Sequence, residues 1–296
     1  MAKLETPQLP VPADATGLEL LEDKDPEVEY VKKQFNLLLY RLRHIQGAVG
    51  ARLRGRFALT LAREPWTVET AYGPLSFVAL GKGPAGRAGS LFTKQPDTIA
   101  WIDSFRPGSV FWDVGANVGV YTLYAARRGD TRVVSFEPAA VNYFVLSANC
   151  EINAFDERVT CLLMGLGQGK SIAQLDVSQF DAGLSFSFRS KRSRPSSGHQ
   201  AALIMSMDQM VGELGLACPN YIKIDVPGLT DDIVAGGMQL LRNPAVRELH
   251  IECGLESKGG RRIVEMLNSV GFAPVGDTSR GGGGDITFAR APGGSR

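Results

Sequence analysis

The sequence predicts an α/β fold in which a mostly parallel sheet is covered by helices on both faces. Two observations predict this fold. Between residues 110 and 290, short apolar runs alternate with segments of helical periodicity, and strands separated by helices form parallel sheets. The first apolar run also ends at an acid and passes through a glycine-containing turn into a helical stretch, which is typical of nucleotide-binding α/β folds. This run reads Val110-Phe111-Trp112-Asp113-Val114-Gly115-Ala116-Asn117-Val118-Gly119-Val120-Tyr121.

The first part of the chain is predicted to be an extension of the core. Residues 1–28 are rich in proline and acidic residues, and we expect them to be poorly ordered. Residues 29–95 are predicted to hold an amphipathic helix and then, from about residue 66, a small β-layer of short strands and glycine-rich loops. The helix can dock on the core or join two subunits in a homo-oligomer. Its apolar residues at helical spacing are Val31, Phe35, Leu38, Leu39 and Leu42.

A basic cluster accompanies this helix. Its members are Arg41, Arg43, His44, Arg52, Arg54 and Arg56. A basic amphipathic segment can lie on an anionic membrane or bind a phosphorylated acceptor. Charge runs usually face solvent, however, and we favour that interpretation.

The core elements follow in chain order. Strands are predicted at residues 110–114, 132–136, 158–164, 221–226 and 247–252. Helices are predicted at residues 118–128, 139–153, 230–242 and 259–270, and the region after the third strand is less regular. A last pair of strands, near 272–276 and 285–290, flanks a run of glycines and is predicted to form an antiparallel hairpin at the edge of the sheet.

The turn after the first core strand indicates the kind of ligand. A dinucleotide-binding turn has glycines in a G-x-G-x-x-G pattern and receives a pyrophosphate, which Asp113 would repel. The same acid would attract a cation, and S-adenosyl-L-methionine (SAM) carries an amino group and a sulfonium beside a ribose. Gly115 and Gly119 let the backbone approach such a ligand closely. Asn117 tolerates the left-handed conformation that a third glycine would otherwise adopt.

A second acid lies at the end of the second core strand. Glu137 is followed by Pro138 and a helical stretch. A carboxylate at this place can accept hydrogen bonds from both hydroxyl groups of a ribose. It can alternatively stabilise the positive end of the next helix. Because both acids occur at the expected places, we favour the cofactor interpretation.

With both motifs in view, the chain resembles the FkbM family of SAM-dependent methyltransferases. The likeness extends from about residue 96 to about residue 254. It rests on Thr98 to Trp101, Phe105 to Ser109, Asp113 to Gly119, Phe136 to Pro138, Asn149 and Asn153, Met207-Asp208, and Tyr221 to Val226. The resemblance implies a class I methyltransferase (Rossmann-like) fold, a methyltransferase domain at residues 96–290 and a flexible tail at 291–296.

The resemblance also implies an activity. It implies O-methylation of a hydroxyl group on a sugar, a glycan or a secondary metabolite, with SAM as cofactor and S-adenosyl-L-homocysteine as product. We predict that the cofactor is bound by Asp113, Gly115, Ala116, Asn117, Gly119, Tyr121, Glu137, Pro138, Met164 and Gly165. Met164 and Gly165 are included because they follow the third strand, where they can contact an adenine face.

One stretch departs from the pattern of the family. After Ile224-Asp225-Val226 the family usually continues Glu-Gly-x-Glu, whereas this chain has Pro227 and Thr230 at the two acidic positions. Asp231 and Asp232 follow immediately and can substitute for the second acid, but nothing replaces the first. A proline there also removes a backbone donor and restricts Val226. The alternative function is therefore a binding or scaffold protein that keeps the cofactor crevice but has reduced catalysis.

Candidate catalytic residues lie at the ends of the later strands. Ligands of such sheets bind at the carboxyl ends of the strands, where the strand order reverses. Asp225, Glu252 and His250 are predicted to orient the acceptor hydroxyl or accept its proton, although Asp225 can also be a helix N-cap and His250 a core histidine. His199 is a further candidate beside a serine-rich basic loop (residues 188–200), which we interpret as a mobile insertion. Lys223 receives no role.

Composition excludes other classes of protein. A hydrophobic content of 44% and a charged content of 21% are those of an ordinary globular protein, and the net charge of +1 argues against a strongly basic nucleic-acid binder. No N-terminal apolar stretch follows a basic start, so we expect no signal peptide, and the longest helical apolar run is too short to span a membrane. The cysteines are widely spaced, so we expect neither a metal site nor disulfides in this cytoplasmic enzyme. They are Cys150, Cys161, Cys218 and Cys253.

Overall fold

The computed structural model describes residues 26–62, 64–78, 80–177, 181–188, 198–275 and 284–290. The chain divides into two compact units, Met1–Glu64 and Pro65–Arg296. Most of the predicted extension at residues 1–28, most of the basic loop and the predicted tail at 291–296 lie outside the described residues.

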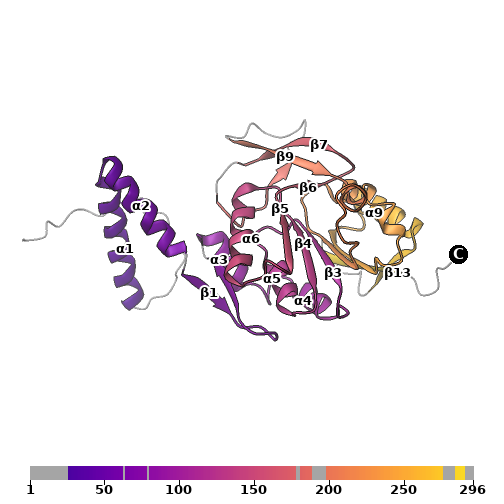
Figure 1. Ribbon diagram of the computed structural model, residues 1–296, viewed down its shortest axis with the longest axis horizontal. Helices are drawn as coiled ribbons and strands as arrows, with labels where there is room; N and C mark the ends of the chain where they lie inside the picture. Colours follow the sequence, from indigo (N-terminus) through magenta and orange to yellow (C-terminus); the bar gives the residue numbers. More distant parts are fainter. Residues whose placement is uncertain are drawn as a thin grey trace, which may run out of the picture. The chain divides into compact units, whose positions relative to one another are not determined.

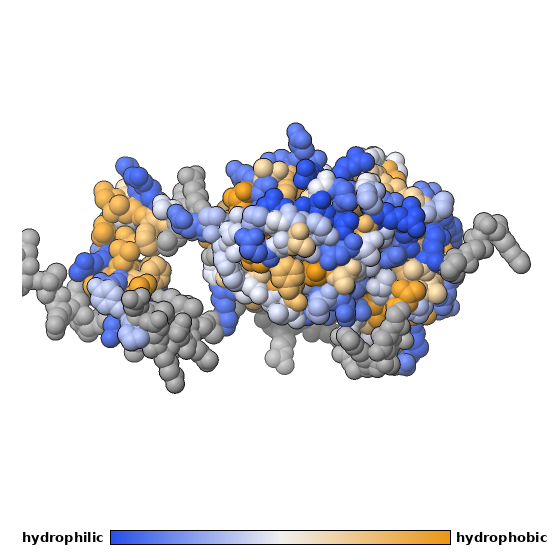
Figure 2. Space-filling model, turned by 90° about the horizontal axis from the view of Figure 1, so that it is seen from below, coloured by the Kyte–Doolittle hydropathy of each residue, from blue (hydrophilic) through white to orange (hydrophobic). Residues whose placement is uncertain are grey.

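The first unit contains two helices where the sequence predicted one. Helix α1 (Pro26–His44) begins earlier than expected and is followed by α2 (Gly47–Ala62). The two helices contact each other through Phe35 and Phe57, whose ring centroids are 6.4 Å apart. Arg54 donates hydrogen bonds to the carbonyls of Leu42 and Ile45 and so provides partners for backbone carbonyl groups at the C-terminal end of α1. Several hydrophobic side chains of this unit are exposed, as the orange surface in Figure 2 shows.

The second unit is built on a seven-stranded sheet whose strand order is β12-β13-β11-β10-β3-β4-β5 (Figure 1). The strands are β3 (Val110–Val114), β4 (Arg132–Phe136), β5 (Val159–Leu162), β10 (Tyr221–Ile224), β11 (Glu248–Cys253), β12 (Phe272–Val275) and β13 (Gly284–Arg290). All neighbours are parallel except those of β13, which runs antiparallel to both β11 and β12. The predicted α/β fold and the antiparallel pair at the sheet edge are therefore confirmed, with β12 outermost.

Helices cover both faces of the sheet. Helices α5 (Val120–Arg127) and α6 (Ala140–Ile152) pack on one face, and α7 (Met207–Gly212), α8 (Thr230–Ala235) and α9 (Lys258–Ser269) pack on the other (Figure 1). Strand β3 is buried along its whole length because its alternating side chains enter both apolar layers, Phe111 on one face and Trp112 on the other. The continuous apolar run in the sequence is explained by this position.

A β-hairpin precedes the sheet and is attached to it by a helix. Strands β1 (Pro65–Val68) and β2 (Leu75–Val78) pair in antiparallel fashion. The backbone amides of Val78 and Ser76 donate to the side chains of Asn149 and Asn153 on α6, and Asn149 also donates to the carbonyl of Val118 in the glycine turn. The two asparagines of the family resemblance thus connect the hairpin, α6 and the turn.

Three segments differ from the sequence-based expectation. Residues 66–95 were expected to hold only strands and loops, but α3 (Lys82–Gly89) forms there, followed by α4 (Pro96–Asp103). The helix predicted at 230–242 ends at Ala235, because Gly236 and Gly237 pack directly against Gly167 and Met207, and a short 3₁₀ turn follows at Leu240–Arg242.

The third difference is a second, four-stranded sheet in the region predicted to be irregular. Its order is β6-β9-β7-β8. The strands are β6 (Gly165–Leu166), β7 (Ser171–Asp176), β8 (Ser187–Phe188) and β9 (His199–Met205). This sheet brings the segment before β8 toward the carboxyl ends of β3 and β4, where Asn117 contacts it.

Candidate active site

The glycine turn after β3 lies at the point where the strand order reverses between β3 and β10. Gly115, Asn117 and Gly119 adopt positive φ angles of 84°, 53° and 88°, which confirms the left-handed conformation expected of Asn117. A Cβ atom on Gly115 would lie 2.3 Å from the Asp225 carbonyl oxygen, so this residue has to be glycine for β3 and β10 to approach. The turn forms the crevice in which α/β sheets bind nucleotides.

Glu137 connects the two turns that border this crevice. Its Oε2 accepts a hydrogen bond of 2.8 Å from the Asn117 amide, and its Oε1 accepts one of 2.8 Å from the Ala139 amide at the start of α6. Burial nevertheless raises the pKa of this carboxyl to about 7. The structure therefore gives Glu137 the helix-capping contact and a place beside the glycine turn at the same time. A carboxylate has about four acceptor sites, so Glu137 keeps acceptor capacity for a ribose hydroxyl beside its contacts with Ala139, Asn117 and Asn142.

Asp113 is buried directly beneath the turn. Its Oδ2 accepts a hydrogen bond of 2.6 Å from the Thr122 hydroxyl, whereas its buried Oδ1 has no partner among the described residues. Burial raises the pKa of this carboxyl, and the Lys223 ammonium opposes the increase. The Lys223 ammonium therefore provides part of the positive charge that Asp113 was predicted to attract.

Lys223, to which the sequence analysis gave no role, lies at the centre of the charged groups of the site. It is fully buried in β10, in register with Asp113 on β3. Its Nζ lies 2.9 Å from Asp225 Oδ2 and 5.0 Å from the centre of the Tyr121 ring. Burial lowers the pKa of Lys223, but the charges of Asp225 and Asp113 outweigh it and raise the pKa overall. A lysine two residues before an acid in a buried strand shares its face with that acid, and this spacing could have identified it.

Asp225 and Glu252 form a carboxyl pair beside Lys223. The hydrogen bond and negative charge of Asp225, together with burial, raise the pKa of Glu252 to about 7. Burial disfavours the ionised form of Asp225, but Lys223 and the hydrogen bond from Glu252 outweigh burial and lower its pKa. Near neutral pH the pair therefore holds an ionised Asp225 and a Glu252 that can gain or lose a proton.

The two histidine candidates line neither of the two cavities that meet at Asp225, although His250 on β11 is in register with Lys223 and lies 3.7 Å from Asp285. His250 is buried and stacks on Trp101, and its two ring nitrogens lie 3.0 Å and 2.9 Å from the hydroxyls of Thr98 and Thr287. It has the surroundings of a core histidine. His199 lies in the second sheet, 3.2 Å from Asp176.

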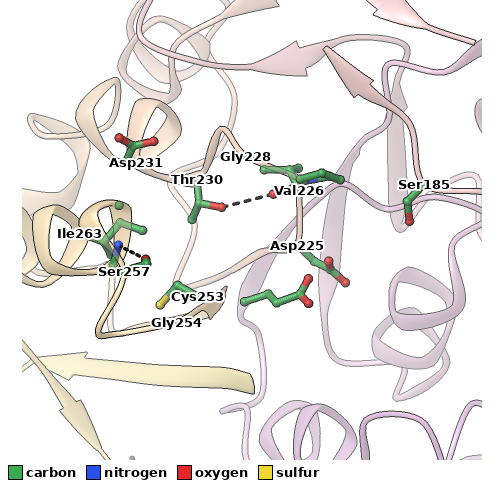
Figure 3. Close-up of a pocket in the computed structure, with 14 residues that line it drawn as sticks. Ser185, Asp225, Val226, Gly228, Thr230, Asp231, Cys253, Gly254, Ser257 and Ile263 are labelled. Carbon is green, nitrogen blue, oxygen red and sulfur yellow. Dashed lines mark hydrogen bonds between the residues drawn. The ribbon is translucent and has the colours of Figure 1, made fainter. Parts of the chain in front are cut away.

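Two cavities meet at Asp225. The first is the cofactor crevice, of about 50 Å³, lined by Gly115, Asn117, Glu137, Pro138 and neighbours that include Arg87 and Asn142. The second has a volume of about 550 Å³ and is lined by the loop after β10, the end of β11 and the starts of α8 and α9 (Figure 3). We call it the acceptor cavity. Asp225, Val226, Pro227 and Ser185 line both cavities.

The remaining predicted residues have different surroundings. Tyr121 donates a hydrogen bond to Gln95, and its ring lies over Lys223. Ala116 is buried in the core. Met164 is buried in the apolar layer with α7, and a Cβ on Gly165 would lie 2.8 Å from Ile204; neither residue lines the two cavities. The same holds for Asp113, Ala116, Gly119 and Tyr121, and the contact of Met164 and Gly165 with adenine stays a prediction.

The residues of the crevice fit SAM chemically. An unsatisfied carboxylate oxygen of Asp113 and the carboxyl of Glu137 flank a turn that has no side chains at its glycines. Such groups suit a cationic amino group and a ribose. The residues that would hold the cofactor are Asp113, Gly115, Asn117, Gly119 and Glu137. Within the described part of the chain, no group of three His, Cys, Asp or Glu side chains could hold a metal ion.

The sheet order, the single antiparallel strand β13 and the glycine turn with its two acids define a class I methyltransferase. The model of the methyltransferase FkbM domain matches residues 113–273, and the chain belongs to this family of methyltransferases. It is a SAM-dependent methyltransferase. The resemblance of the sequence motifs to the FkbM family is thereby confirmed.

Individual proteins are similar over most of the chain. Hexuronic acid methyltransferase AglP of Haloferax volcanii is 23% identical over 216 residues, which are 72% of this chain and 86% of that protein. The crystal structure of methyltransferase FkbM from Methylobacillus flagellatus KT has 15% identity and a TM-score of 0.42, covering 68% of this chain and 47% of that chain. Magnesium protoporphyrin IX methyltransferase from Synechocystis PCC 6803, with bound SAM, has 14% identity and a TM-score of 0.42, covering 70% and 81%.

Proposed function

We propose that the protein transfers the methyl group of SAM to a hydroxyl group of a sugar, a glycan or a secondary metabolite. The observation that carries this proposal is the Asp225–Glu252 pair, which lines the acceptor cavity where it meets the cofactor crevice. The similarity to a hexuronic acid methyltransferase supports a sugar as the acceptor. The cavity also presents hydroxyls and backbone groups suited to a hydroxylated molecule, at Ser185, Thr230 and Ser257.

The carboxyl pair provides a place for the proton that an acceptor hydroxyl loses. Bound SAM supplies a methyl group on a sulfonium, which is an activated leaving group. Glu252, with a pKa of about 7, accepts the hydroxyl proton. Lys223 keeps Asp225 ionised, so that Asp225 can accept a hydrogen bond and orient either Glu252 or the acceptor. Alignment of the acceptor in the cavity provides the remaining rate enhancement.

Pro227 and Thr230 replace the acids of the family within the acceptor cavity. Both residues line it, and the Thr230 hydroxyl lies 3.4 Å from the Val226 carbonyl (Figure 3). Since two carboxylates of the family are absent from this wall, Glu252 on β11 is the carboxyl that we assign to proton acceptance. The second candidate function, a methyltransferase-like protein with reduced catalysis, is favoured by this same replacement.

Incubation with labelled SAM distinguishes the two functions. The acceptor panel contains neutral glycosides, hexuronides, sugar nucleotides and aliphatic alcohols, and SAM binding is measured in parallel by calorimetry. Transfer of label to a hydroxyl that is lost in Glu252→Gln supports the proposal. SAM binding without transfer to any acceptor, with transfer restored in Pro227→Glu/Thr230→Glu, supports reduced catalysis.

A matched control is available in the same cavity. Asp231 lines the acceptor cavity but is paired with Arg262 at 2.9 Å. Asp231→Asn therefore removes a carboxylate of the same wall without changing the Asp225–Glu252 pair. We expect it to retain most of the transfer activity.

Two further properties are proposals. We propose a cytoplasmic location, supported by four free cysteines. We also propose a homo-oligomer that forms through helix α1, supported by the exposed hydrophobic residues of this helix. Fractionation of cells and light scattering of the purified protein test them. No described helix is long and apolar enough to cross a membrane.

A further inference from the structure

A short segment forms part of the wall of the cofactor crevice. We call residues 181–188, which precede and include β8, the strap. Its residues Ser185, Phe186 and Phe188 line the crevice opposite Gly115 and Glu137. The space that remains is about 50 Å³, enough for a few water molecules, whereas pockets for ligands of drug-like size measure roughly 300–1,000 Å³. SAM cannot occupy the crevice while the strap holds this position.

The strap is bonded to the residues that border the crevice. The Leu184 carbonyl accepts hydrogen bonds of 2.9 Å from the Asn117 side chain and 3.0 Å from the Asn142 side chain. The Gly183 amide donates one of 2.8 Å to Asn142. Asn117 belongs to the glycine turn itself, so the strap occupies a side chain of the predicted cofactor site.

Helix α3 also binds the strap. Arg87 donates a hydrogen bond of 2.5 Å to the Gly183 carbonyl and one of 3.3 Å to the Ser185 hydroxyl. The two backbones touch at a pair of glycines, because a Cβ on Gly83 would lie 2.1 Å from the Ala182 carbonyl oxygen. Gly183 has a φ of 84°, and a Cβ there would lie 2.6 Å from Gly83. This contact requires glycine on both sides.

We propose that the strap closes the cofactor crevice of the free enzyme, that α3 and Asn142 hold it closed, and that SAM binds by displacing it. The apparent affinity for SAM is then reduced by the fraction of molecules in which the strap is open. Since Ser185 lines the acceptor cavity as well, displacement of the strap also reshapes that cavity. The inference rests on SAM binding at the crevice and is independent of the identity of the acceptor.

Two alanine variants of α3 test the proposal. Gly83→Ala places a methyl group against the strap, whereas Gly86→Ala, in the same helix, meets nothing within 4 Å and is the matched control. Surface plasmon resonance measures SAM association with each protein. A closed state that opens in about a tenth of the molecules or fewer predicts an association rate constant about tenfold higher in Gly83→Ala, with no change in Gly86→Ala. An unchanged rate, or faster dissociation and weaker binding, would overturn the proposal.

A second measurement uses the unaltered protein, in case Gly83→Ala does not fold. Hydrogen exchange of the strap amides, including that of Gly183, is followed by mass spectrometry with and without SAM. Displacement predicts faster exchange in residues 181–188 when SAM is bound. Slower exchange would show that the strap covers the bound cofactor instead, which contradicts the proposal. Failure of SAM to bind at all would refute the cofactor site itself and this proposal with it, whereas binding without methyl transfer leaves only the activity in question.

Discussion

Replacement of Lys223 by methionine tests the electrostatic arrangement at the centre of the site. The ammonium is fully buried, lies 2.9 Å from Asp225 and shares its register with Asp113. Methionine fills a similar volume without a charge, so the variant removes the cation and little packing. Two carboxyl groups then lose their counter-charge inside the protein.

The magnitude follows from the burial of the pair. Removing one partner of a buried ion pair costs about 3–5 kcal/mol, because the other charge is left without compensation. In the unaltered protein the pKa of Asp225 is lower in the folded state than in the unfolded state. Asp225 therefore stabilises the fold at pH values above its unfolded-state pKa. This contribution is lost as the pH falls from the unfolded-state pKa through the folded-state pKa. Without Lys223, burial raises the pKa of Asp225. The variant therefore regains stability when Asp225 is protonated, and its deficit is smaller at pH 5 than at pH 8.

Urea unfolding at both pH values measures the effect. We expect Lys223→Met to lose about 3–5 kcal/mol at pH 8 and clearly less at pH 5. The double variant Lys223→Met/Asp225→Asn, which leaves neither charge, should recover more than about 1 kcal/mol of that loss. A deficit below about 1 kcal/mol at pH 8, or one that does not change with pH, would refute the reasoning.

Three other predictions concern the site. The rate of methyl transfer should increase as the pH rises through about 7, because Glu252 accepts a proton only when it is ionised. Glu252→Gln should lower kcat/KM by about 100-fold or more and abolish this limb of the pH–rate profile. An unchanged profile would exclude Glu252 as the base. SAM should bind about tenfold more weakly at pH 6 than at pH 8, since Glu137, with a pKa of about 7, accepts hydrogen bonds from the ribose hydroxyls best when it is ionised. Equal affinities by calorimetry would argue against the ribose contact. Gly115→Ala should abolish SAM binding and lower Tm, because its φ is 84° and its methyl group would lie 2.3 Å from the Asp225 carbonyl, whereas Gly169→Ala, which meets nothing within 4 Å, should bind SAM normally.

The parts of the fold that the sequence predicted are those with continuous burial. Strands 110–114 and 132–136 were located to the residue because each is an uninterrupted apolar run followed by a turn. The second sheet was missed because β7 and β9 are exposed on one face, where hydrophobic Ile172 and Leu203 obscure the usual alternation. Helix α3 was missed because its glycines resemble a loop, and tertiary packing of Pro84 and Ala88 overrides that propensity.

The residues of the site that could be predicted are those that follow from local sequence patterns. The glycine turn, Asp113 and Glu137 follow from local spacing, and Asp225 and Glu252 from the ends of strands. The spacing of Lys223 and Asp225 was visible in the sequence, but the place of Lys223 beside Asp113 needed the register of β3 and β10. The strap needed contacts between residues about 100 positions apart, such as Arg87 with Gly183. Contacts at that separation leave no periodic pattern in the sequence.

The place of β13 in the sheet has a consequence for synthesis on the ribosome. Strand β13 lies between β11 and β12, although both precede it in the chain. Until residues 284–290 have emerged, the outer edge of β11 has no strand to pair with, and β12 has no neighbour through which to join the sheet. The nascent chain can therefore assemble β3, β4, β5, β10 and β11 first and must insert its seventh strand afterwards. A truncation before residue 284 would remove an interior strand and not an edge.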